Sequence, residues 1–343
     1  MSIRSSVLAA TELPRRYPVW TIQQAPDRAG RRQRLRLWTQ IGFFVLFILA
    51  PVFDLFRYDL TRGHAFLLGF EWRLGLDDYF AGKITGTEAG IQILLRLFVP
   101  IFGGAALFIA VAWRWGRLYC GWLCPHFSVV ETINALMRRA SGKPSFWEAK
   151  PLPAANPDGS PFRVDRRWWL VTVPFAIVFA ALWAVVLLTY LLPPQEVYAH
   201  LFAFAPTRNE AIFITAATIV LTLEFLFARH LFCRFGCAVG LFQSLAWMSN
   251  REAMVVGFQR PRAADCATCY SAASMGTAAC EAVCPMRLRP RVPKHQMFTC
   301  TQCAQCIAAC STVQDGRPAG SLLEWVDKTE ARTNETRMSL TGS

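Results

Sequence analysis

The residues of this sequence that are best suited to chemistry are its twelve cysteines, none of which precedes residue 120. Four of them form two pairs with the spacing C-x3-C, Cys120 with Cys124 and Cys233 with Cys237. Residues i and i+4 of a helix share a face, so each pair can present two sulfurs to one centre. Thiolates bind copper(I), zinc and iron–sulfur clusters, and each pair could instead cycle between dithiol and disulfide. The structural alternative is that the pairs are apolar cysteines at a membrane interface.

The other eight cysteines have the spacing of a site for two 4Fe–4S clusters. The later run is C-x2-C-x2-C-x3-C, as in bacterial ferredoxins, where the fourth cysteine ligates the neighbouring cluster. The earlier run has ten residues between its second and third cysteines, and closing that longer loop costs about 1–1.5 kcal/mol more. A zinc site more often shows two separated C-x2-C knuckles with histidine. The crossed assignment gives one cluster Cys266, Cys269, Cys280 and Cys310 and the other Cys284, Cys300, Cys303 and Cys306.

Several charged or basic residues lie beside the C-x3-C pairs. Arg117 and Arg234 would favour thiolate over thiol, or they are ordinary arginines of a positively charged loop. His126 and His230 lie within three residues of a pair and are either further metal ligands or solvated side chains. Glu224 lies near the end of an apolar stretch, where an acid is either functional or in contact with headgroups.

The composition predicts a membrane protein. Hydrophobic residues make up 54% of the 343 residues and charged residues only 17%, which is unusual for a soluble domain. The formal net charge of +13 indicates a membrane rather than nucleic acid, because the arginines lie beside hydrophobic runs instead of forming one basic face. Four stretches are long enough to span a bilayer as helices: 37–53, 91–113, 168–192 and 211–228.

The distribution of Lys and Arg predicts the orientation of these spans. The N-terminal arm, the 114–167 loop and the segment from residue 229 carry 8, 9 and 13 of them, whereas loops 54–90 and 193–210 carry 4 and 1. By the positive-inside rule, both termini and every cysteine face the cytoplasm. That compartment is reducing, which further disfavours structural disulfides.

We therefore expect an all-α polytopic membrane protein of about four transmembrane helices, with a cytoplasmic α+β domain of the bacterial two-cluster ferredoxin type. The predicted divisions are a basic arm at 1–36, a transmembrane domain at 37–250, the ferredoxin-type domain at 251–326 and a disordered tail at 327–343.

Three stretches resemble the CcoG family of membrane iron–sulfur proteins, also called RdxA or FixG. They are "GRLYCGWLCP", "CRFGCAVGLFQSLAWMSNREAMVVGF" and "FTCTQCAQCIAACSTVQDGRPAGSLLEW". NapH, MauN and NosR share the same general plan, so the wider superfamily is implied as well. The resemblance extends over roughly residues 36–326, and we expect the chain to lack the C-terminal immunoglobulin-like domain of the CcoG family.

The resemblance implies an iron–sulfur electron-transfer protein of the bacterial inner membrane, an oxidoreductase that reduces copper(II) to copper(I) for cytochrome oxidase maturation. Its implied cofactors are two 4Fe–4S clusters, with copper or a third cluster at the C-x3-C pairs. Oxidase assembly factors or a redox partner protein would be its partners. One alternative is a quinol dehydrogenase subunit of the NapH or NosR type, with a quinol pocket in the outer stretch 55–80. Another is a redox or metal sensor, or an assembly scaffold.

Overall fold

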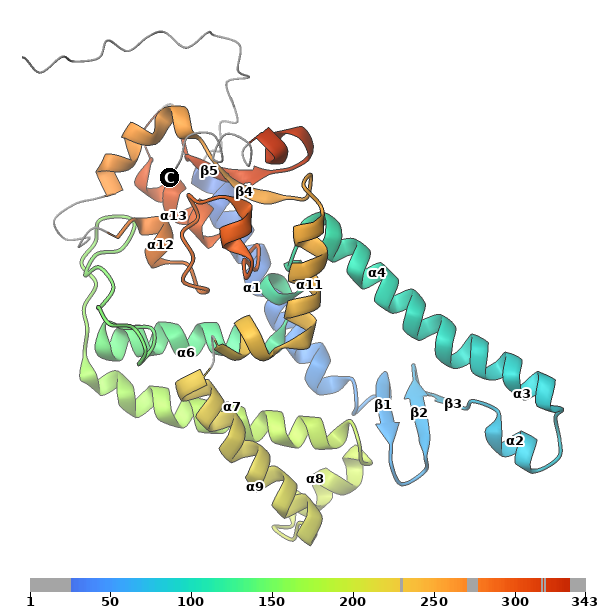
Figure 1. Cartoon of the computed structure of the whole chain (residues 1–343). Coiled ribbons are helices and arrows are strands. Elements are labelled where there is room, and N and C mark those ends of the chain that lie inside the picture. The colour runs from blue at the N-terminus through green and yellow to red at the C-terminus, as the bar shows by residue number, and fades with distance from the viewer. Residues whose placement is uncertain (1–25, 229–230, 270–276, 316, 318, 334–343) are drawn as a thin grey trace, which may run out of the picture.

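The computed structural model describes residues 26–228, 231–269, 277–315, 317 and 319–333. These residues form long helices with a compact cysteine-rich domain at one end (Figure 1). The elements up to residue 228 are α1 (Pro26–Leu49), β1 (Phe56–Asp59), β2 (His64–Leu67), β3 (Phe70–Trp72), α2 (Leu76–Phe80), α3 (Gly86–Ile93), η1 (Leu94–Phe98), α4 (Val99–Trp115), α5 (Leu118–Trp122), α6 (Pro125–Ser141), η2 (Arg166–Trp168), α7 (Trp169–Thr189), α8 (Pro194–Phe202), α9 (Arg208–Leu223) and η3 (Glu224–Ala228).

The second half of the chain contains shorter elements. They are η4 (Phe232–Gly236), α11 (Ala238–Ser249), β4 (Val255–Phe258), η5 (Arg260–Cys269), α12 (Ala279–Ala282), η7 (Lys294–Met297), α13 (Gln305–Val313) and β5 (Leu323–Val326). Strands β4 and β5 pair antiparallel from Val255 opposite Val326 to Phe258 opposite Leu323. The buried core of this domain includes Ile307 and Leu322 together with several of the cysteines.

Among the described residues, three helices are long and apolar enough to cross a membrane. They are Gly86–Trp115, made of α3, η1 and α4, then Arg166–Thr189 and Arg208–Ala228. Each exceeds the roughly 20 residues that a bilayer core requires. They correspond to three of the four spans that the sequence predicts, and the charged residue Arg96 lies within the first, in the π-helical turn η1.

The predicted span at 37–53 does not meet the same requirement. It belongs to α1, whose first half carries Arg32, Arg34 and Arg36, and α1 ends at Leu49. The remaining helical part from residue 37 rises only about 20 Å, against the roughly 30 Å of a hydrocarbon core. The described residues therefore support three spans rather than four.

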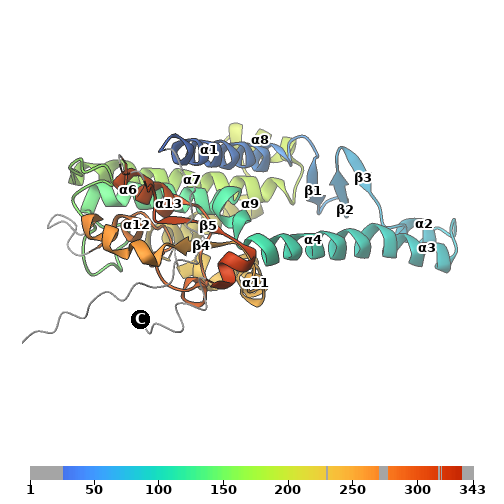
Figure 2. The same cartoon turned by 90° about the horizontal axis from the view of Figure 1, so that it is seen from above.

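Two of the spans pack closely, and one stands apart. Ala176, Ala180 and Ala184 form one fully buried stripe on α7, and such small residues allow the close approach of a neighbouring helix. Helix α6 packs on the same core through Ile133, and η3 through Phe225. By contrast, α4 extends away from α7 and α9 and ends at the cysteine-rich domain (Figures 1 and 2).

The loops opposite the cysteine-rich domain are well defined. Helices α3 and α9 both begin there with a capping box, Thr85 with Glu88 and Thr207 with Glu210. Strands β1, β2 and β3 form an antiparallel sheet at the same end (Figure 1). Asp59 is fully buried in this sheet and pairs with Arg57 at 2.8 Å. The outer stretch 55–80 therefore holds a small sheet around a buried ion pair, whereas most of its large apolar side chains are exposed.

The two ends of the chain differ from the predicted divisions where they are described. Residues 26–36 begin α1 instead of forming a separate arm, and residues 1–25 lie outside the described part. Residues 328–333 of the expected tail are helical, and Ala331 is buried in the core of the cysteine-rich domain. Asp327 also pairs with Arg114 at 2.5 Å. Apolar burial and this ion pair order the segment, and residues 334–343 lie outside the described part.

Candidate iron–sulfur and thiolate site

The two C-x3-C pairs occupy matching positions in two helix–helix connections. Cys120 lies in α5 and Cys124 is the N-cap of α6, while Cys233 lies in η4 and Cys237 is the N-cap of α11. Each second cysteine therefore lies at a helix N-terminus, and in the first pair Pro125 starts the helix with the φ angle that it needs. The duplication seen in the sequence is thus a duplication of local structure.

The four thiols of the pairs lie close enough together to affect one another electrostatically. Burial raises the pKa of Cys124 to about 12, and the nearby Cys120 and Cys237 raise it further, against backbone N–H groups that lower it. Burial is also the main cause that raises the pKa of Cys233, with contributions from Cys124, Cys120 and Glu224. The pairs therefore form a single group of sulfurs, in which burial keeps the Cys124 and Cys233 thiols protonated at neutral pH unless a cation is bound.

The eight remaining cysteines fall into two groups of four. In the first group, the charge of Cys310 raises the pKa of the other three thiols. The members of this group are Cys266, Cys269, Cys280 and Cys310. The thiols of Cys284, Cys300, Cys303 and Cys306 line one small cavity of about 20 Å³. These are the two sets of the crossed assignment. That each set ligates a 4Fe–4S cluster stays a prediction.

The chemistry of each set suits an iron–sulfur cluster. Burial raises the pKa of Cys284 to about 11 and that of Cys300 to about 12, so bare sulfurs here would hold their protons. Backbone N–H groups point at the sulfurs, from Leu288 to Cys284 at 3.4 Å and from Leu322 to Cys310 at 3.3 Å. Such hydrogen bonds stabilise negative charge on sulfur and tune cluster potentials. The residues present therefore fit the clusters.

Within the described residues, no three His, Cys, Asp or Glu side chains converge as ligands of one metal ion. A cubane has four irons at alternate corners, so its thiolates lie further apart than the ligands of a single ion. A single copper ion held by the C-x3-C pairs stays a prediction.

The three cysteine groups are in direct contact. A Cβ atom added to Gly121, between the first pair, would lie 2.1 Å from the backbone oxygen of Thr301, between two cysteines of the second set. The indole N–H of Trp122 donates to the carbonyl of Gln302 at 3.0 Å. Cys233 packs with Phe127 and Met286 in a small core that Cys124 and Cys284 also contact. Cys280 and Cys306 lie in the same buried core, which links the two sets of four.

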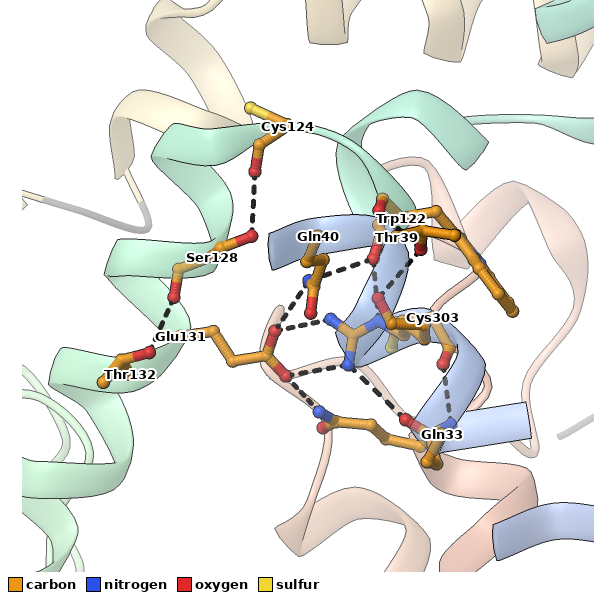
Figure 3. A network of polar contacts seen from close by, with 12 residues as sticks. Gln33, Thr39, Gln40, Trp122, Cys124, Ser128, Glu131, Thr132 and Cys303 are labelled. Carbon is orange, nitrogen blue, oxygen red and sulfur yellow. Dashed lines mark hydrogen bonds and ion pairs between the residues drawn. The ribbon is translucent and has the colours of Figure 1, made fainter. Parts of the chain in front are cut away.

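A polar network fixes this junction, as Figure 3 shows. Arg36 of α1 donates to the carbonyl of Gly121 at 2.7 Å and pairs with Glu131 of α6 at 2.5 Å. The side chain of Gln33 donates to the carbonyl of Cys303 at 3.0 Å, and Gln305 donates to Glu131. The network thus joins α1, α5, α6 and the cysteine-rich domain around the first C-x3-C pair.

His126 is enclosed rather than solvated. Its Nε2 atom lies 3.3 Å from a carboxylate oxygen of Glu224, and the rings of Trp183, Phe225 and Phe232 surround it. Glu224 begins the π-helical turn η3, and its side chain is only 13% exposed. Of the two alternatives that the sequence left open for this acid, its burial beside His126 favours a functional role over contact with headgroups. His230, the other histidine predicted as a metal ligand, lies outside the described residues.

Sequence reasoning missed several residues of the site. In the sequence, Arg36 contributes only to the positive charge at a membrane edge. In the structure it is buried and forms an ion pair with Glu131. Gly121 carried no signal, because its role depends on contact with a loop 180 residues later. Gln243, one turn into α11, donates to the sulfur of Cys120 at 3.7 Å. The lone Glu131 within an apolar face of α6 is the one feature that could have indicated a buried partner.

Comparison with known proteins supports an iron–sulfur assignment. The family model described as a 4Fe-4S binding domain, Fer4_5, matches residues 97–144 and 210–252, and each matched segment contains one C-x3-C pair. These segments lie almost entirely before the predicted ferredoxin-type domain. The family match therefore associates 4Fe–4S binding with the membrane-edge part of the chain.

Three curated relatives match over much of the chain. The regulatory protein NosR of Pseudomonas aeruginosa is 28% identical over 222 residues, which is 62% of this chain and 26% of that protein. NosR of Stutzerimonas stutzeri is 25% identical over 56% of this chain and 23% of its own length. Protein RdxA of Cereibacter sphaeroides is 27% identical over 68% of this chain and 46% of its own length.

The chain thus spans about a quarter of the two NosR proteins and about half of RdxA. No solved structure matches. Together with the three apolar helices, the 4Fe-4S family match and these similarities support a membrane iron–sulfur protein that is similar to NosR and RdxA.

Proposed function

We propose that the chain is a membrane-bound electron-transfer protein that reduces copper(II) to copper(I), or a related acceptor, for cytochrome oxidase maturation. The observation that carries the proposal is the contact between three groups of four cysteines, which extends from the cysteine-rich domain to the ends of the membrane helices. Bound 4Fe–4S clusters would supply reversible one-electron chemistry at these positions. The resemblance to CcoG and RdxA proteins supplies copper as the substrate.

The protein's own residues provide what such a function requires. Cys303 and Cys306 of the second set are buried and Cys284 and Cys300 are half-buried, so water has limited access to these sulfurs. Gly121 allows the C-x3-C turn to touch the Thr301 backbone, and the network of Arg36 and Glu131 holds both sides in place. A fixed short separation between redox groups favours electron transfer over side reactions with solvent. The orientation proposed from the positive-inside rule places these groups at the cytoplasmic face of a bacterial inner membrane.

The test is anaerobic purification of the full chain followed by metal analysis and a copper assay. We expect at least eight iron atoms and eight labile sulfides per chain, and twelve of each with a third cluster. After reduction with dithionite and its removal, each copper(II) added should take one electron and appear as copper(I) bound to a colorimetric chelator. The quadruple variant Cys120→Ser, Cys124→Ser, Cys233→Ser, Cys237→Ser should keep eight irons and lose most of this activity. A wild-type chain without iron would refute the proposal.

A second candidate function, quinol oxidation, has one specific observation in its favour. An apolar cavity of about 790 Å³ lies between α4 and α5, beside the turn that holds Cys120. Tyr119, Trp122 and Gln243 line it together with Leu107 and Phe108 of α4. This volume is in the range of small-molecule sites. It lies at the cysteine-rich end of α4, far from the outer stretch 55–80 in which the sequence suggested a quinol pocket (Figure 1).

The two candidate functions differ in whether a soluble quinol should reduce the oxidised protein. If the chain oxidises quinol, anaerobic addition of reduced duroquinol should bleach the cluster absorbance of the oxidised protein. Phe108→Trp, which fills the cavity, should slow this step while leaving copper(II) reduction by dithionite-treated protein unchanged. Bleaching that is identical in both proteins would exclude the cavity as the quinol site.

A further inference from the structure

Arg117 is a fully buried cation between the two C-x3-C pairs. It is the N-cap residue of α5, and only 1% of its surface is exposed. Its guanidinium donates to the carbonyl oxygen of Cys233 at 2.8 Å and reaches the sulfur of Cys120 at 3.7 Å. One side chain therefore contacts both pairs, although the pairs are more than 100 residues apart in the sequence.

The structure around Arg117 is shaped for a guanidinium. Gly240 of α11 lies against it, and a Cβ atom at that position would be 2.1 Å from Nη2 and 2.9 Å from Cζ of Arg117. Such a contact is far inside van der Waals distance, so any larger residue at position 240 would displace the arginine. One turn later in α11, Gln243 donates to the same Cys120 sulfur that Arg117 approaches.

Arg117 differs from the other buried arginines in its lack of an acidic partner. Arg36 pairs with Glu131 and Arg57 with Asp59, whereas no carboxylate among the residues described here forms an ion pair with Arg117. Its Nε atom also has no hydrogen-bond acceptor. A buried charge without a counter-ion is strongly unfavourable, so an anion is expected beside it.

Sulfur is the element available to carry that negative charge. Besides Cys120 and Cys233, the positive charge of Arg117 acts on Cys300 of the second set, where it opposes the rise in pKa that burial causes. Neutral thiols and a disulfide carry no charge and cannot balance a guanidinium. Thiolates bound to a metal centre remain anionic even when buried.

We propose that Arg117 is the counter-ion of an anionic, thiolate-ligated centre held by Cys120, Cys124, Cys233 and Cys237. The inference rests on the proposed electron-transfer function and excludes disulfide cycling at the pairs. Arg117 acts as a positioning and potential-setting residue. Its positive charge stabilises the reduced form of a centre that gains one negative charge with each electron.

The experiment compares three variants of the full chain, purified and reconstituted anaerobically, by iron analysis and EPR-monitored redox titration. Arg117→Met removes the charge and Arg117→Lys keeps it. Arg138→Met is the matched control, because Arg138 is half-buried at the far end of α6, about 20 Å along the helix from Cys124. Tryptic mapping of the wild type after alkylation without reductant reports whether either pair forms a disulfide.

We expect Arg117→Met to lower the reduced-to-oxidised ratio of at least one centre tenfold or more at fixed potential, which is about 59 mV for a one-electron couple. Arg117→Lys and Arg138→Met should retain wild-type potentials. If Arg117→Met does not retain iron, Arg117→Lys decides alone, and wild-type iron and potentials in it support the role of charge.

Three results would overturn the proposal: unchanged potentials in an iron-loaded Arg117→Met protein, equal effects of Met and Lys, or a Cys120–Cys124 or Cys233–Cys237 disulfide in iron-loaded wild type. Absence of iron from the wild type would instead refute the proposed function.

Discussion

Replacement of Gly121 by alanine should separate the C-x3-C turn from the adjacent cysteine loop. The new Cβ atom would meet the Thr301 oxygen at 2.1 Å, the Thr301 carbonyl carbon at 3.1 Å and the Cys303 nitrogen at 3.4 Å. All three are backbone atoms, which cannot rotate away as the end of a flexible side chain would. Steric overpacking of this kind typically costs 1–3 kcal/mol, and the rigid obstacle favours the upper limit of about 3 kcal/mol.

A cost of that size reduces the population of the docked junction on the order of 100-fold relative to the separated one. The assay is a thermal melt of the detergent-solubilised chain, followed by the loss of cluster absorbance. We expect the midpoint to fall by about 6–12 °C, since 1 kcal/mol shifts the melting temperature of a large domain by about 2–4 °C. Copper(II) reduction should decline in parallel, because the redox groups lose their fixed contact.

Gly42→Ala is the matched control, since a Cβ atom at Gly42 of α1 would have no heavy atom within 4 Å. Alanine also has the higher helix propensity, so this variant should melt at the wild-type temperature or slightly above it. If Gly121→Ala melted like the wild type and reduced copper at the same rate, the contact between the turn and the cysteine loop would not be tight, and the reasoning would fail.

Three further predictions concern separate parts of the molecule. Glu131→Gln should leave the buried Arg36 without its anion and lower the free energy of unfolding by about 3 kcal/mol, measured as a lower melting midpoint, whereas the joint replacement Arg36→Met, Glu131→Gln should recover part of the loss. Burial raises the pKa of Asp59, but hydrogen bonds from Thr61, Arg57 and the backbone outweigh it and lower the pKa to about 2. This carboxylate therefore contributes about 2 kcal/mol that is present above its unfolded pKa of 3.8 and lost as the pH falls towards 2, so melts of wild type and Asp59→Asn should converge between pH 4 and 2. Cys284→Ser and Cys266→Ser should each remove the EPR signal of a different cluster, and loss of the same signal in both would contradict the crossed assignment.

The cysteine spacing predicts the two crossed sets, because the local run C-x2-C-x2-C-x3-C directs its fourth cysteine to the neighbouring cluster. In the structure, Cys310 acts on Cys280, and Cys284, Cys300, Cys303 and Cys306 line one cavity. Ligation of one cluster by each set stays a prediction. The spans at α4, α7 and α9 were predictable because apolar length alone decides them. Helix α1 was harder, since its apolar second half looks like a span, while Arg36 of its arginine-rich first half is buried and donates to the carbonyl of Gly121.

The charged residues of the site were not predictable from composition. Arg117 has the same sequence context as a solvated loop arginine, and only the closure of α5 against α11 buries it. The same holds for Arg36 and Glu131, which lie 95 residues apart in the sequence and become partners only in the folded chain. The spacing of one residue type within a short stretch of sequence cannot predict pairs between residues so far apart in the chain.

The polar network around Glu131 also sets an order of assembly. Gln33 donates a hydrogen bond to the carbonyl of Cys303, 270 residues later, and Gln305 donates one to Glu131. Contacts of such long sequence separation form late in folding, because the intervening chain must first be organised. The membrane helices can therefore be inserted while the junction is still open, and it closes only after residue 305 has been synthesised. Metal loading of the second cysteine set would accordingly be a late step in biogenesis. It would follow when the segment around Cys303 and Gln305 contacts α1 and α6.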